Sequence, residues 1–332
     1  MVAKAKSTWK AKAMKRINNL YDKICSIENL QLADSKARKG KSGQYGIKVH
    51  DQNREANILR LHEILKSGNY KTSPYTTFTI FEPKERIIYR LPYFPDRITH
   101  HAVMNIMEPI FTAMFTADTY SCIKGKGIHA ASFALRQALK DASGTQYCLK
   151  LDIKKFYPSI DHETLKALLR RKIKDAALLT LLDGIIESAE GLPIGNYLSQ
   201  YYANFYLTYF DHWIKEQKGV RHYFRYADDI VILSDSKPYL HSILSEIRNY
   251  LSEKLKLSVK ENYQVFPVEA RGIDFVGYVH YHSCTYLRKS IKQDFARMLH
   301  YRKNPQSVAS YRGWAVHGNT KHLLKKLLHE KV

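Results

Sequence analysis

The segment His222-Tyr-Phe-Arg-Tyr-Ala-Asp-Asp-Ile-Val-Ile-Leu233 places two adjacent aspartates between two runs of strand-forming residues. Aromatic residues precede the acids and aliphatic residues follow them, which predicts a β-hairpin with Ala227, Asp228 and Asp229 at its turn. An isolated Asp-Asp pair is usually a solvated turn, because neighbouring carboxylates repel each other. A hairpin tip is also a rigid place to hold a carboxylate, so both interpretations need a second observation.

A second acid occurs in a similar setting earlier in the chain. Residues 147–151 form a short apolar segment that predicts a strand, and Asp152 ends it. Asp152 and Asp228 are 76 residues apart in the sequence. Because hard divalent cations prefer carboxylate oxygens, two acids at the ends of strands predict a shared metal site. We therefore expect folding to bring Asp152 and Asp228 within a few ångströms of each other.

The charge of the chain is concentrated at its ends. The sequence has 332 residues, enough for two or three packed subdomains, and its 45% hydrophobic content and 24 tyrosines argue against disorder. Of the net charge of +22, residues 1–50 carry +9, residues 281–332 carry +9 and the middle of the chain +4. This distribution predicts a polyanion held by the flanking segments, with chemistry between them. The alternative is a generally solubilising charge.

Cysteine spacing and hydropathy exclude several protein classes. The four cysteines, at positions 25, 122, 148 and 284, are far apart and form no Cys-x-x-Cys pair. This pattern argues against a zinc site and against a disulfide framework. No apolar run approaches 18 residues, and the N-terminus lacks the apolar stretch of a signal peptide. We expect a soluble cytoplasmic protein without a membrane partner.

Hydrophobic periodicity predicts a mixture of helices and strands. Helices are expected over residues 8–32, 52–66, 102–115, 128–141, 162–174, 201–210, 240–251, 291–300 and 322–329. Strands are expected over residues 76–81, 87–91, 147–152, 255–260 and 271–278, besides the Asp-Asp hairpin. A mobile Lys- and Gly-rich loop is expected over residues 36–43. Asp96 is a predicted N-cap, and His100 and His101 are interpreted as structural because adjacent helical side chains diverge.

Four motifs occur in an order that resembles the palm of reverse transcriptases. They are Asp152-Ile-Lys-Lys-Phe-Tyr157, Leu192-Pro-Ile-Gly-Asn-Tyr-Leu-Ser-Gln200, Tyr226-Ala-Asp-Asp229 and Phe275-Val-Gly-Tyr278. Pro95-Asp-Arg-Ile-Thr-His-His101 and Thr119-Tyr-Ser-Cys-Ile-Lys-Gly-Lys-Gly127 are similar to the fingers of group II-intron-like bacterial members. The resemblance covers about residues 76–280. It implies an α+β right-hand polymerase fold with an N-terminal extension (1–75), fingers (76–145), palm (146–280) and a helical thumb (281–332).

Within this family the chain resembles the reverse transcriptases of diversity-generating retroelements. Ile194 and Gln200 stand where most relatives carry Gln and Pro, and residues 309–317 read Ala-Ser-Tyr-Arg-Gly-Trp-Ala-Val-His. The resemblance implies error-prone copying of a structured template RNA, particularly at adenines, with a small basic oligomeric accessory protein as partner. Two alternatives are a phage-defence or other bacterial enzyme that copies a non-coding RNA, and a catalytically idle RNA-binding scaffold.

The resemblance also implies the roles of individual residues. Asp152, Asp228 and Asp229 are the expected catalytic residues, and with the Ile153 carbonyl they would bind two Mg²⁺ ions, which Mn²⁺ could replace. Deoxynucleotide contacts are expected from Lys84, Arg86, Arg90, Phe156, Tyr157, Ile194, Gly195, Gln200 and Lys260. From the residues alone, Lys84, Arg86 and Arg90 could equally be solvated, and Tyr157 could be a core residue. Contacts with template RNA and the RNA–cDNA hybrid are expected from Lys124, Lys126, Tyr226, Arg288 and Lys289.

Overall fold

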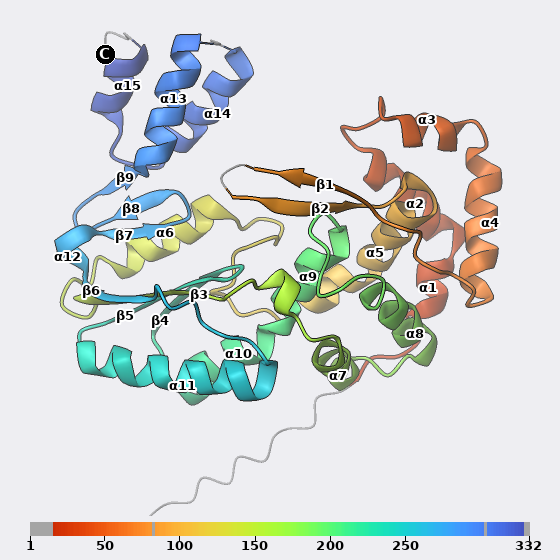
Figure 1. Ribbon diagram of the computed structural model, residues 1–332, viewed down its shortest axis with the longest axis horizontal. Helices are drawn as coiled ribbons and strands as arrows, with labels where there is room; N and C mark the ends of the chain where they lie inside the picture. The colour runs from red at the N-terminus through yellow and green to blue at the C-terminus, as the bar shows by residue number, and fades with distance from the viewer. Residues whose placement is uncertain (1–15, 82–83, 302–303, 329–332) are drawn as a thin grey trace, which may run out of the picture. The chain divides into compact units, whose positions relative to one another are not determined.

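The computed structural model describes residues 16–81, 84–301 and 304–328 (Figure 1). The chain divides into two compact units, which we call the helical unit (residues 1–108 and 161–198) and the sheet unit (residues 109–160 and 199–332). The four polymerase subdomains expected from the sequence stay a prediction, because a division into two compact units does not test them. Among the described residues, no helix is both long enough and apolar enough to span a bilayer.

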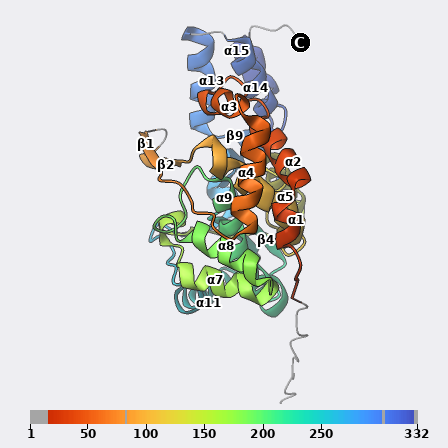
Figure 2. The same ribbon diagram turned by 90° about the vertical axis from the view of Figure 1, so that its right-hand side faces the viewer.

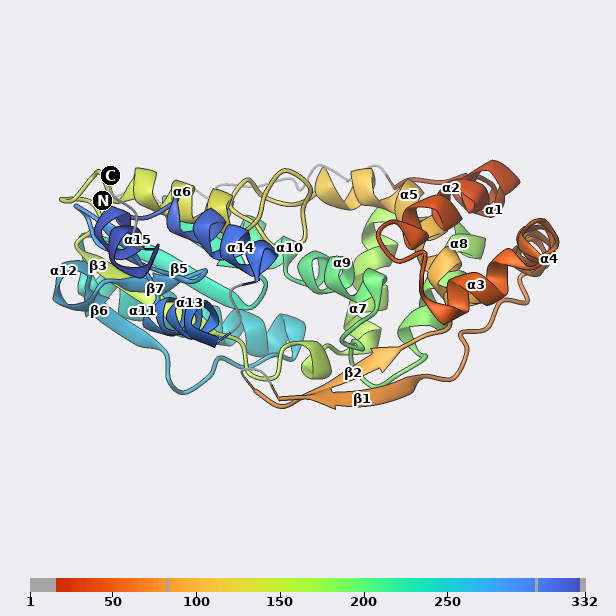
Figure 3. The ribbon, with the colours of Figure 1, turned by 90° about the horizontal axis from the view of Figure 1, so that it is seen from above.

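The helical unit consists of helices and a two-stranded ribbon that is largely exposed. Its elements are α1 (Tyr21–Cys25), α2 (Ile27–Arg38), α3 (Tyr45–Asp51), α4 (Arg54–Lys66), β1 (Thr76–Ile80), β2 (Arg86–Arg90), a π-helical turn (Tyr93–Arg97), α7 (His162–Lys172) and α8 (Ala176–Ile186). Helix α5 (Ile98–Thr112) begins in this unit and ends in the other. β1 and β2 form an antiparallel ribbon (Figure 3). Helix α7 packs against α8 (Figure 2), so the apolar residues of both are buried.

One carboxylate fastens the start of the described chain to α8. Asp175 caps α8 by accepting a hydrogen bond from the amide of Leu178 at 3.2 Å. Its other oxygen accepts from the amides of Leu20 and Tyr21 at 2.7 and 3.0 Å. These bonds hold the pKa of Asp175 below its usual value although burial alone would raise it.

Three predictions for this unit are wrong. The helix expected over residues 8–32 starts outside the described residues, and the described part is broken at Ser26, whose hydroxyl caps α2 by accepting from the amide of Asn29. The loop expected over residues 36–43 begins later, because Arg38 is held in α2 by Asp34 and Asp51. Asp96 is not an N-cap, since its carboxylate accepts from the Tyr70 hydroxyl and the Ser73 amide.

The sheet unit contains a four-stranded antiparallel sheet in the order β4-β5-β3-β6. Its strands are β3 (Tyr147–Asp152), β4 (His222–Tyr226), β5 (Asp229–Ser234) and β6 (Gln264–Pro267). Helix α11 (Lys237–Leu255) covers one face of this sheet and α6 (Ile128–Ala138) packs on the other (Figure 1). Helix α9 (Tyr197–Tyr206) leads to α10 (Thr208–His212) and a π-helical turn at Trp213–Gln217. The Phe210 and Trp213 rings of these last two elements contact Tyr250 of α11. The central strands are therefore buried on both faces.

A second sheet carries the C-terminal helices. Strands β7 (Ile273–Phe275), β8 (Tyr278–His280) and β9 (Thr285–Leu287) form an antiparallel meander, followed by α13 (Lys289–Tyr301), α14 (Pro305–Ala315) and α15 (Lys321–Leu328). A Cβ atom at Gly277 would lie 2.3 Å from the Trp314 ring, so the glycine is required for this contact. The Tyr278 hydroxyl donates to the Trp314 carbonyl at 2.9 Å. The residue 309–317 motif thus packs against the Phe275–Tyr278 motif.

Several element predictions for the sheet unit are also wrong. Residues 255–260 do not form a strand, because α11 runs to Leu255 and ends in a left-handed residue, Lys256. The helix expected over residues 201–210 is two helices, α9 and α10, that meet at Leu207. The sequence did not predict β6, β9 or α14, nor α8 in the helical unit. β6 and β9 are too short for local pattern to distinguish them from loops, whereas the spacing of Leu178, Leu181, Leu182 and Ile185 in α8 is helical and should have predicted that helix.

Candidate active site

The predicted Asp-Asp hairpin is present at the end of the four-stranded sheet. β4 and β5 pair so that Tyr226 lies opposite Asp229, which leaves Ala227 and Asp228 as a two-residue turn. Ala227 has a φ of 55°, the left-handed value that glycine usually supplies in such turns. The turn is therefore strained, and it is rigid because the strands that carry it are buried.

Asp152 reaches the same edge of the sheet from β3. β3 and β5 are antiparallel, and their register places Asp152 directly opposite Asp229. Burial, the charge of Asp152 and a hydrogen bond with its carboxylate raise the pKa of Asp228 to about 7. Burial first, and then the charges of Asp152 and Asp274, raise the pKa of Asp229 to about 6. Three carboxyl groups thus share one site, as the sequence predicts for Asp152 and Asp228.

Two lysines lie against these acids. The Lys260 ammonium is 2.7 Å from Asp152 Oδ2, and the Lys260 amide donates to the Asp152 carbonyl at 2.8 Å. The Lys150 ammonium is 3.8 Å from Asp229 Oδ2 and also donates to the Asp274 carbonyl. Each lysine offsets part of the repulsion among the acids. The predicted basic residue at position 260 therefore does reach the site, next to Asp152.

The donor set fits magnesium. Asp152 Oδ1 and Asp229 Oδ1 are buried and lack a hydrogen-bond partner, which is costly unless a cation completes them. Ile153 and Val259 form an antiparallel bridge in which the hydrogen bonds are made by the neighbouring residues and not by the pair itself. The Ile153 carbonyl therefore points away from Val259, toward the side on which the hairpin lies. Among the described residues, no group of three or more Asp, Glu, His or Cys side chains is placed to hold a metal ion by itself, so further oxygen ligands would have to complete the site. Magnesium sites that also use substrate phosphates are of this open kind.

The aromatic pair after Asp152 lies in a short turn beside the site. Phe156 is buried and contacts the half-buried Tyr157 edge-on, with ring centroids 5.8 Å apart. Lys155 has a φ of 45°, so the chain turns sharply there. The turn sets Tyr157 at the start of a 3-10 segment, Tyr157–Ser159. The predicted sugar contact of Tyr157 stays a prediction, and Phe156 is a core residue by burial.

Other predicted nucleotide contacts lie in the helical unit. The basic side chains Lys84, Arg86 and Arg90 are exposed on or beside the β1–β2 ribbon. The Tyr89 amide donates to the Ile194 carbonyl at 2.7 Å, so the Leu192–Gln200 motif is tied to β2. A Cβ atom at Gly195 would lie 2.5 Å from the Tyr89 carbonyl oxygen. Within this unit the structure thus brings Ile194 and Gly195 together with the ribbon. Gln200 is exposed on α9 and belongs to the sheet unit.

The predicted nucleic-acid contacts differ in their surroundings. Lys124 and Lys289 are exposed, whereas Tyr226 is half-buried against the core of the sheet unit. Arg288 donates to Asp274 Oδ1 at 2.7 Å. The Lys126 ammonium donates to the carbonyls of residues 117 and 119 at 2.7 and 3.0 Å. A contact between Lys126 and nucleic acid would require these backbone bonds to break.

Sequence reasoning missed a buried ion pair behind the hairpin. Arg225 of β4 and Asp211 of α10 have fully buried side chains, and their closest nitrogen and oxygen atoms are 2.5 Å apart. The signal was available in part, since an arginine inside an otherwise apolar strand must find an acid. The sequence could not say which acid, because the partner lies 14 residues earlier in a different element.

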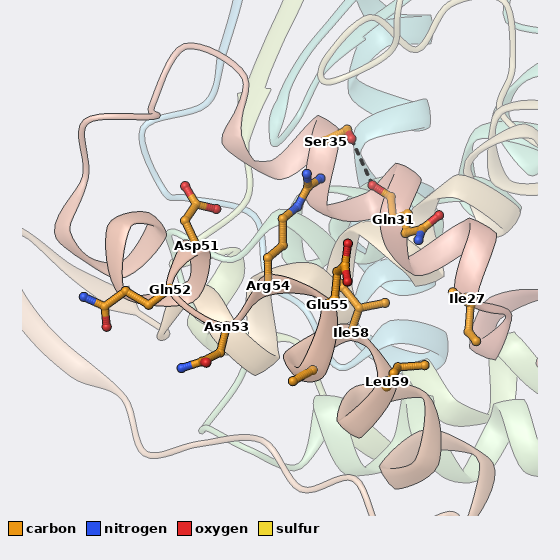
Figure 4. A pocket seen from close by; sticks show the side chains of 11 residues that line it. Ile27, Gln31, Ser35, Asp51, Gln52, Asn53, Arg54, Glu55, Ile58 and Leu59 are labelled. Carbon is orange, nitrogen blue, oxygen red and sulfur yellow. Dashed lines mark hydrogen bonds between the residues drawn. The ribbon is translucent and has the colours of Figure 1, made fainter.

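The helical unit also contains a cavity of about 970 Å³ (Figure 4). Its lining mixes acidic, basic, amide and aliphatic side chains from α2 and α4, among them Gln31, Arg54, Glu55 and Ile58. Ser35 donates to the Gln31 carbonyl at 3.0 Å, and Arg54 is paired with Asp34 at 2.7 Å. None of the predicted site residues lines it.

Comparisons with known proteins give the family that the sequence matches. Residues 81–280 match the family described as "Reverse transcriptase (RNA-dependent DNA polymerase)". Protein YkfC of Escherichia coli (strain K12) is 27% identical over 272 residues, covering 68% of this chain and 70% of that protein. The group II intron-encoded protein LtrA of Lactococcus lactis subsp. cremoris is 28% identical over 177 residues, covering 49% of this chain and 29% of LtrA. The chain therefore spans less than a third of LtrA.

Among solved structures, a telomerase from Candida albicans in complex with a fragment of telomeric RNA aligns with a TM-score of 0.48 and 10% identity. The alignment covers 80% of this chain and 58% of that one. A telomerase from Candida tropicalis aligns with a TM-score of 0.44 and 13% identity, over 69% of this chain and 52% of that one.

Proposed function

Because the chain belongs to the reverse transcriptase (RNA-dependent DNA polymerase) family, we propose that its hairpin site joins deoxynucleotides on an RNA template with two Mg²⁺ ions. The right-hand polymerase fold and RNA-directed DNA polymerase activity follow from the family, as do template RNA and deoxynucleotides as substrates. The observation that supports the site is the meeting of Asp152 and Asp228 at one edge of the sheet.

The residues of the site have distinct tasks in this proposal. When bound, the metal ions lower the pKa of the primer 3′-hydroxyl and neutralise charge on the reacting phosphate. Asp152, Asp228 and the Ile153 carbonyl would supply oxygen ligands, and Asp229 would lie beside them. Lys260 holds the Asp152 carboxylate in place, while Lys150 links Asp229 to the segment that carries Asp274. The buried sheet keeps these groups in fixed positions.

The test is primer extension on a defined RNA template. We expect the purified protein to incorporate deoxynucleotides in the presence of Mg²⁺ and to stop when EDTA is added. Mn²⁺ is expected to substitute, since it prefers the same oxygen ligands. An RNA-binding protein that shows no incorporation with either metal would instead be the catalytically idle scaffold.

We further propose that the copying is error-prone and serves a diversity-generating retroelement. Ile194 carries an aliphatic side chain where most relatives of the family place a glutamine. An aliphatic side chain makes no hydrogen bond to the nascent base pair, so selectivity that depends on such bonds falls. The partners of this function would be a structured template RNA and a small basic oligomeric accessory protein. A near-repeat of a target gene in the flanking DNA, differing at adenines, distinguishes this role from defence.

Replacing Ile194 with glutamine is expected to lower misincorporation opposite template adenines by several-fold, because the new amide restores a polar contact at the base pair. The measurement is deep sequencing of cDNA made from one RNA template by both proteins. Ile194→Leu is the matched control, since it keeps an aliphatic side chain and should keep the wild-type error spectrum. Equal spectra for the glutamine and wild-type proteins would remove Ile194 from the account of fidelity.

A second cavity of the helical unit, of about 590 Å³, supports binding of an RNA strand. Its lining includes Arg60, Arg90 and Arg97 and contains no acidic residue. Arg97 is half-buried, and its guanidinium donates to the side chain of Gln44 at 3.3 Å. Burial, and less strongly the charge of Arg90, lower the pKa of Arg97.

Arg97→Gln is expected to weaken RNA binding several-fold and to reduce the salt dependence of the binding constant by about one counterion. The measurement is the RNA affinity at several salt concentrations without divalent metal. Arg170→Gln is the control in the same unit, because Arg170 is already paired with Asp183 and should leave the slope unchanged. If both variants keep the wild-type slope, the arginine-lined cavity does not hold RNA phosphate.

A further inference from the structure

The Asp211–Arg225 pair is the most deeply buried charged group in the described part of the sheet unit. Both side chains have no exposed surface. Arg225 Nε donates to Asp211 Oδ1 at 2.8 Å, and a second guanidinium nitrogen lies 2.5 Å from Asp211 Oδ2. Removing two charges from water costs several kcal/mol each, and a buried pair is often no more stable than well-packed apolar residues. Stability alone therefore gives a weak reason for this pair.

Neutral groups from three elements hold the pair in one geometry. The Tyr223 hydroxyl donates to Asp211 Oδ1 at 2.6 Å, and the Thr119 hydroxyl donates to Asp211 Oδ2 at 3.1 Å. Asn204 Oδ1 accepts from Arg225 Nη1 at 3.1 Å. The Arg225 backbone is bonded as well, since its amide donates to the carbonyl of residue 118 and its carbonyl accepts from the amide of residue 120. The guanidinium consequently has little freedom to move.

The same guanidinium reaches the turn that carries the predicted metal ligand. Arg225 Nη1 donates to the Ala227 carbonyl at 3.0 Å. That carbonyl belongs to the peptide group that joins Ala227 to Asp228, so its hydrogen bond fixes the plane from which the Asp228 side chain departs. Ala227 is the residue with the strained φ of 55°, a conformation that persists only where its surroundings enforce it. A charge-assisted bond from an immobile donor meets that requirement.

We infer that Arg225 is a positioning residue for the metal site. The guanidinium, clamped by Asp211 and Asn204, holds the Ala227–Asp228 peptide so that the Asp228 carboxylate faces Asp152 before any metal arrives. This inference rests on the proposed function of the hairpin acids. Its consequence is that metal affinity depends on the hydrogen bond from Arg225 to Ala227, and not only on the presence of the buried charge pair.

Arg225→Lys tests the inference, because it keeps a positive charge beside Asp211. The lysine ammonium places its donors on a single atom, so it cannot span Asp211, Asn204 and the Ala227 carbonyl as the planar guanidinium does. We expect metal affinity to fall about 10- to 100-fold, as for other groups that orient metal ligands. The measurement is direct titration of the protein with Mn²⁺ by electron paramagnetic resonance, supported by the Mg²⁺ dependence of primer extension.

Tyr223→Phe is the matched control. It removes one hydrogen bond to the same Asp211 carboxylate and leaves the bond to Ala227 in place. Both variants should lose some thermal stability, but only Arg225→Lys should lose metal affinity, whereas Tyr223→Phe should stay within about twofold of the wild type. Equal metal affinity of Arg225→Lys and the wild type, or an equal loss in Tyr223→Phe, would show that the pair is only structural.

Two further variants keep the test decisive. If Arg225→Lys does not fold, the double variant Asp211→Asn with Arg225→Gln replaces it. This double variant removes both charges together and leaves no unpaired buried ion. Its glutamine side chain at position 225 is too short to reach the Ala227 carbonyl. The double variant should fold and show the same loss of affinity. Asp228→Asn separates the two proposals: if it binds Mn²⁺ like the wild type, the hairpin acids are not the metal site, whatever Arg225 does.

Discussion

Asp228→Asn is expected to abolish primer extension while the protein stays folded. Asparagine keeps the size and shape of the side chain but provides no carboxylate, so the pair with Asp152 is lost. Several kcal/mol of transition-state stabilisation depend on the metal ions, which corresponds to a loss in rate of about a thousandfold or more. The measurement is single-turnover incorporation of one deoxynucleotide, with the circular dichroism spectrum as the check on folding.

Lys154→Gln provides the control for Asp228→Asn, because Lys154 is exposed and lies two residues from Asp152 without contacting the acids. It should keep incorporation within a few-fold of the wild type. Extension by the Asp228→Asn protein at a comparable rate would exclude Asp228 as a ligand that the reaction needs. The family assignment would then still hold, but the site would have to lie elsewhere in the fold.

The raised pKa of Asp228 adds a stability prediction that requires no catalysis. Its pKa is about 7 in the folded protein, against about 3.9 for an aspartate in an unfolded chain. The folded state therefore binds a proton that the unfolded state has released, and this contribution to stability is present at pH 4 and is lost as the pH rises to about 7. In EDTA, Asp228→Asn should gain stability relative to the wild type between pH 5 and pH 8, as measured by urea unfolding.

Local pattern was sufficient to predict that Asp152 and Asp228 lie together. The aromatic and aliphatic runs on either side of Ala227 and the apolar run before Asp152 all reflect strands that are buried by their neighbours, and such strands have a strong sequence signal. Asp152 ends β3 and Asp228 lies in the turn between β4 and β5, so antiparallel pairing brings the two acids to one edge. Lys260 was predicted only through the family resemblance. The alternation of residues 255–260 predicted a strand that the structure does not contain, so local pattern gave no guide to the position of Lys260.

Long-range partners account for what the sequence did not show. Aspartate is a common N-cap residue, but the Asp96 carboxylate instead accepts hydrogen bonds from the Tyr70 hydroxyl and the Ser73 amide. Arg225 stands in a motif of obvious interest, yet its role depends on Asp211 in another element. Lys126 lies in a basic, glycine-rich loop that suggests phosphate binding, and its ammonium is directed to backbone carbonyls. In each case the deciding contact joins segments whose proximity is set by the fold.

Gly195→Ala is expected to have the second-largest effect, because the glycine is where the Leu192–Gln200 motif approaches the ribbon. An added Cβ would lie 2.5 Å from the Tyr89 carbonyl oxygen and 3.1 Å from Ile88 Cγ2, and the φ of Gly195 is 115°. Both the contact and the backbone conformation therefore oppose any side chain. We expect a loss of about 2 to 4 kcal/mol in the free energy of unfolding, from overpacking and backbone strain together.

The same substitution should impair nucleotide use beyond its effect on stability. The amide of Tyr89 bonds to the Ile194 carbonyl, so a shift at Gly195 moves the residue proposed to contact the base pair and the strand that carries Arg86 and Arg90. A displacement of about 1 Å can lower a rate by about a hundredfold. The measurement is kcat/KM for a single deoxynucleotide at a temperature where the variant is folded.

Gly184→Ala is the control that makes the Gly195→Ala result specific. Gly184 lies inside α8 of the same unit, and an added Cβ meets no atom within 4 Å. Alanine is the better helix former, so this variant should gain about 0.5 to 1 kcal/mol and keep wild-type kinetics. If Gly195→Ala instead matched the wild type in both unfolding and kcat/KM, the close approach of the loop to β2 would not be needed for either. Both glycines lie in the helical unit, and of the two only Gly195 touches the ribbon. The pair of variants therefore separates the general effect of adding a methyl group from the effect of moving this one loop.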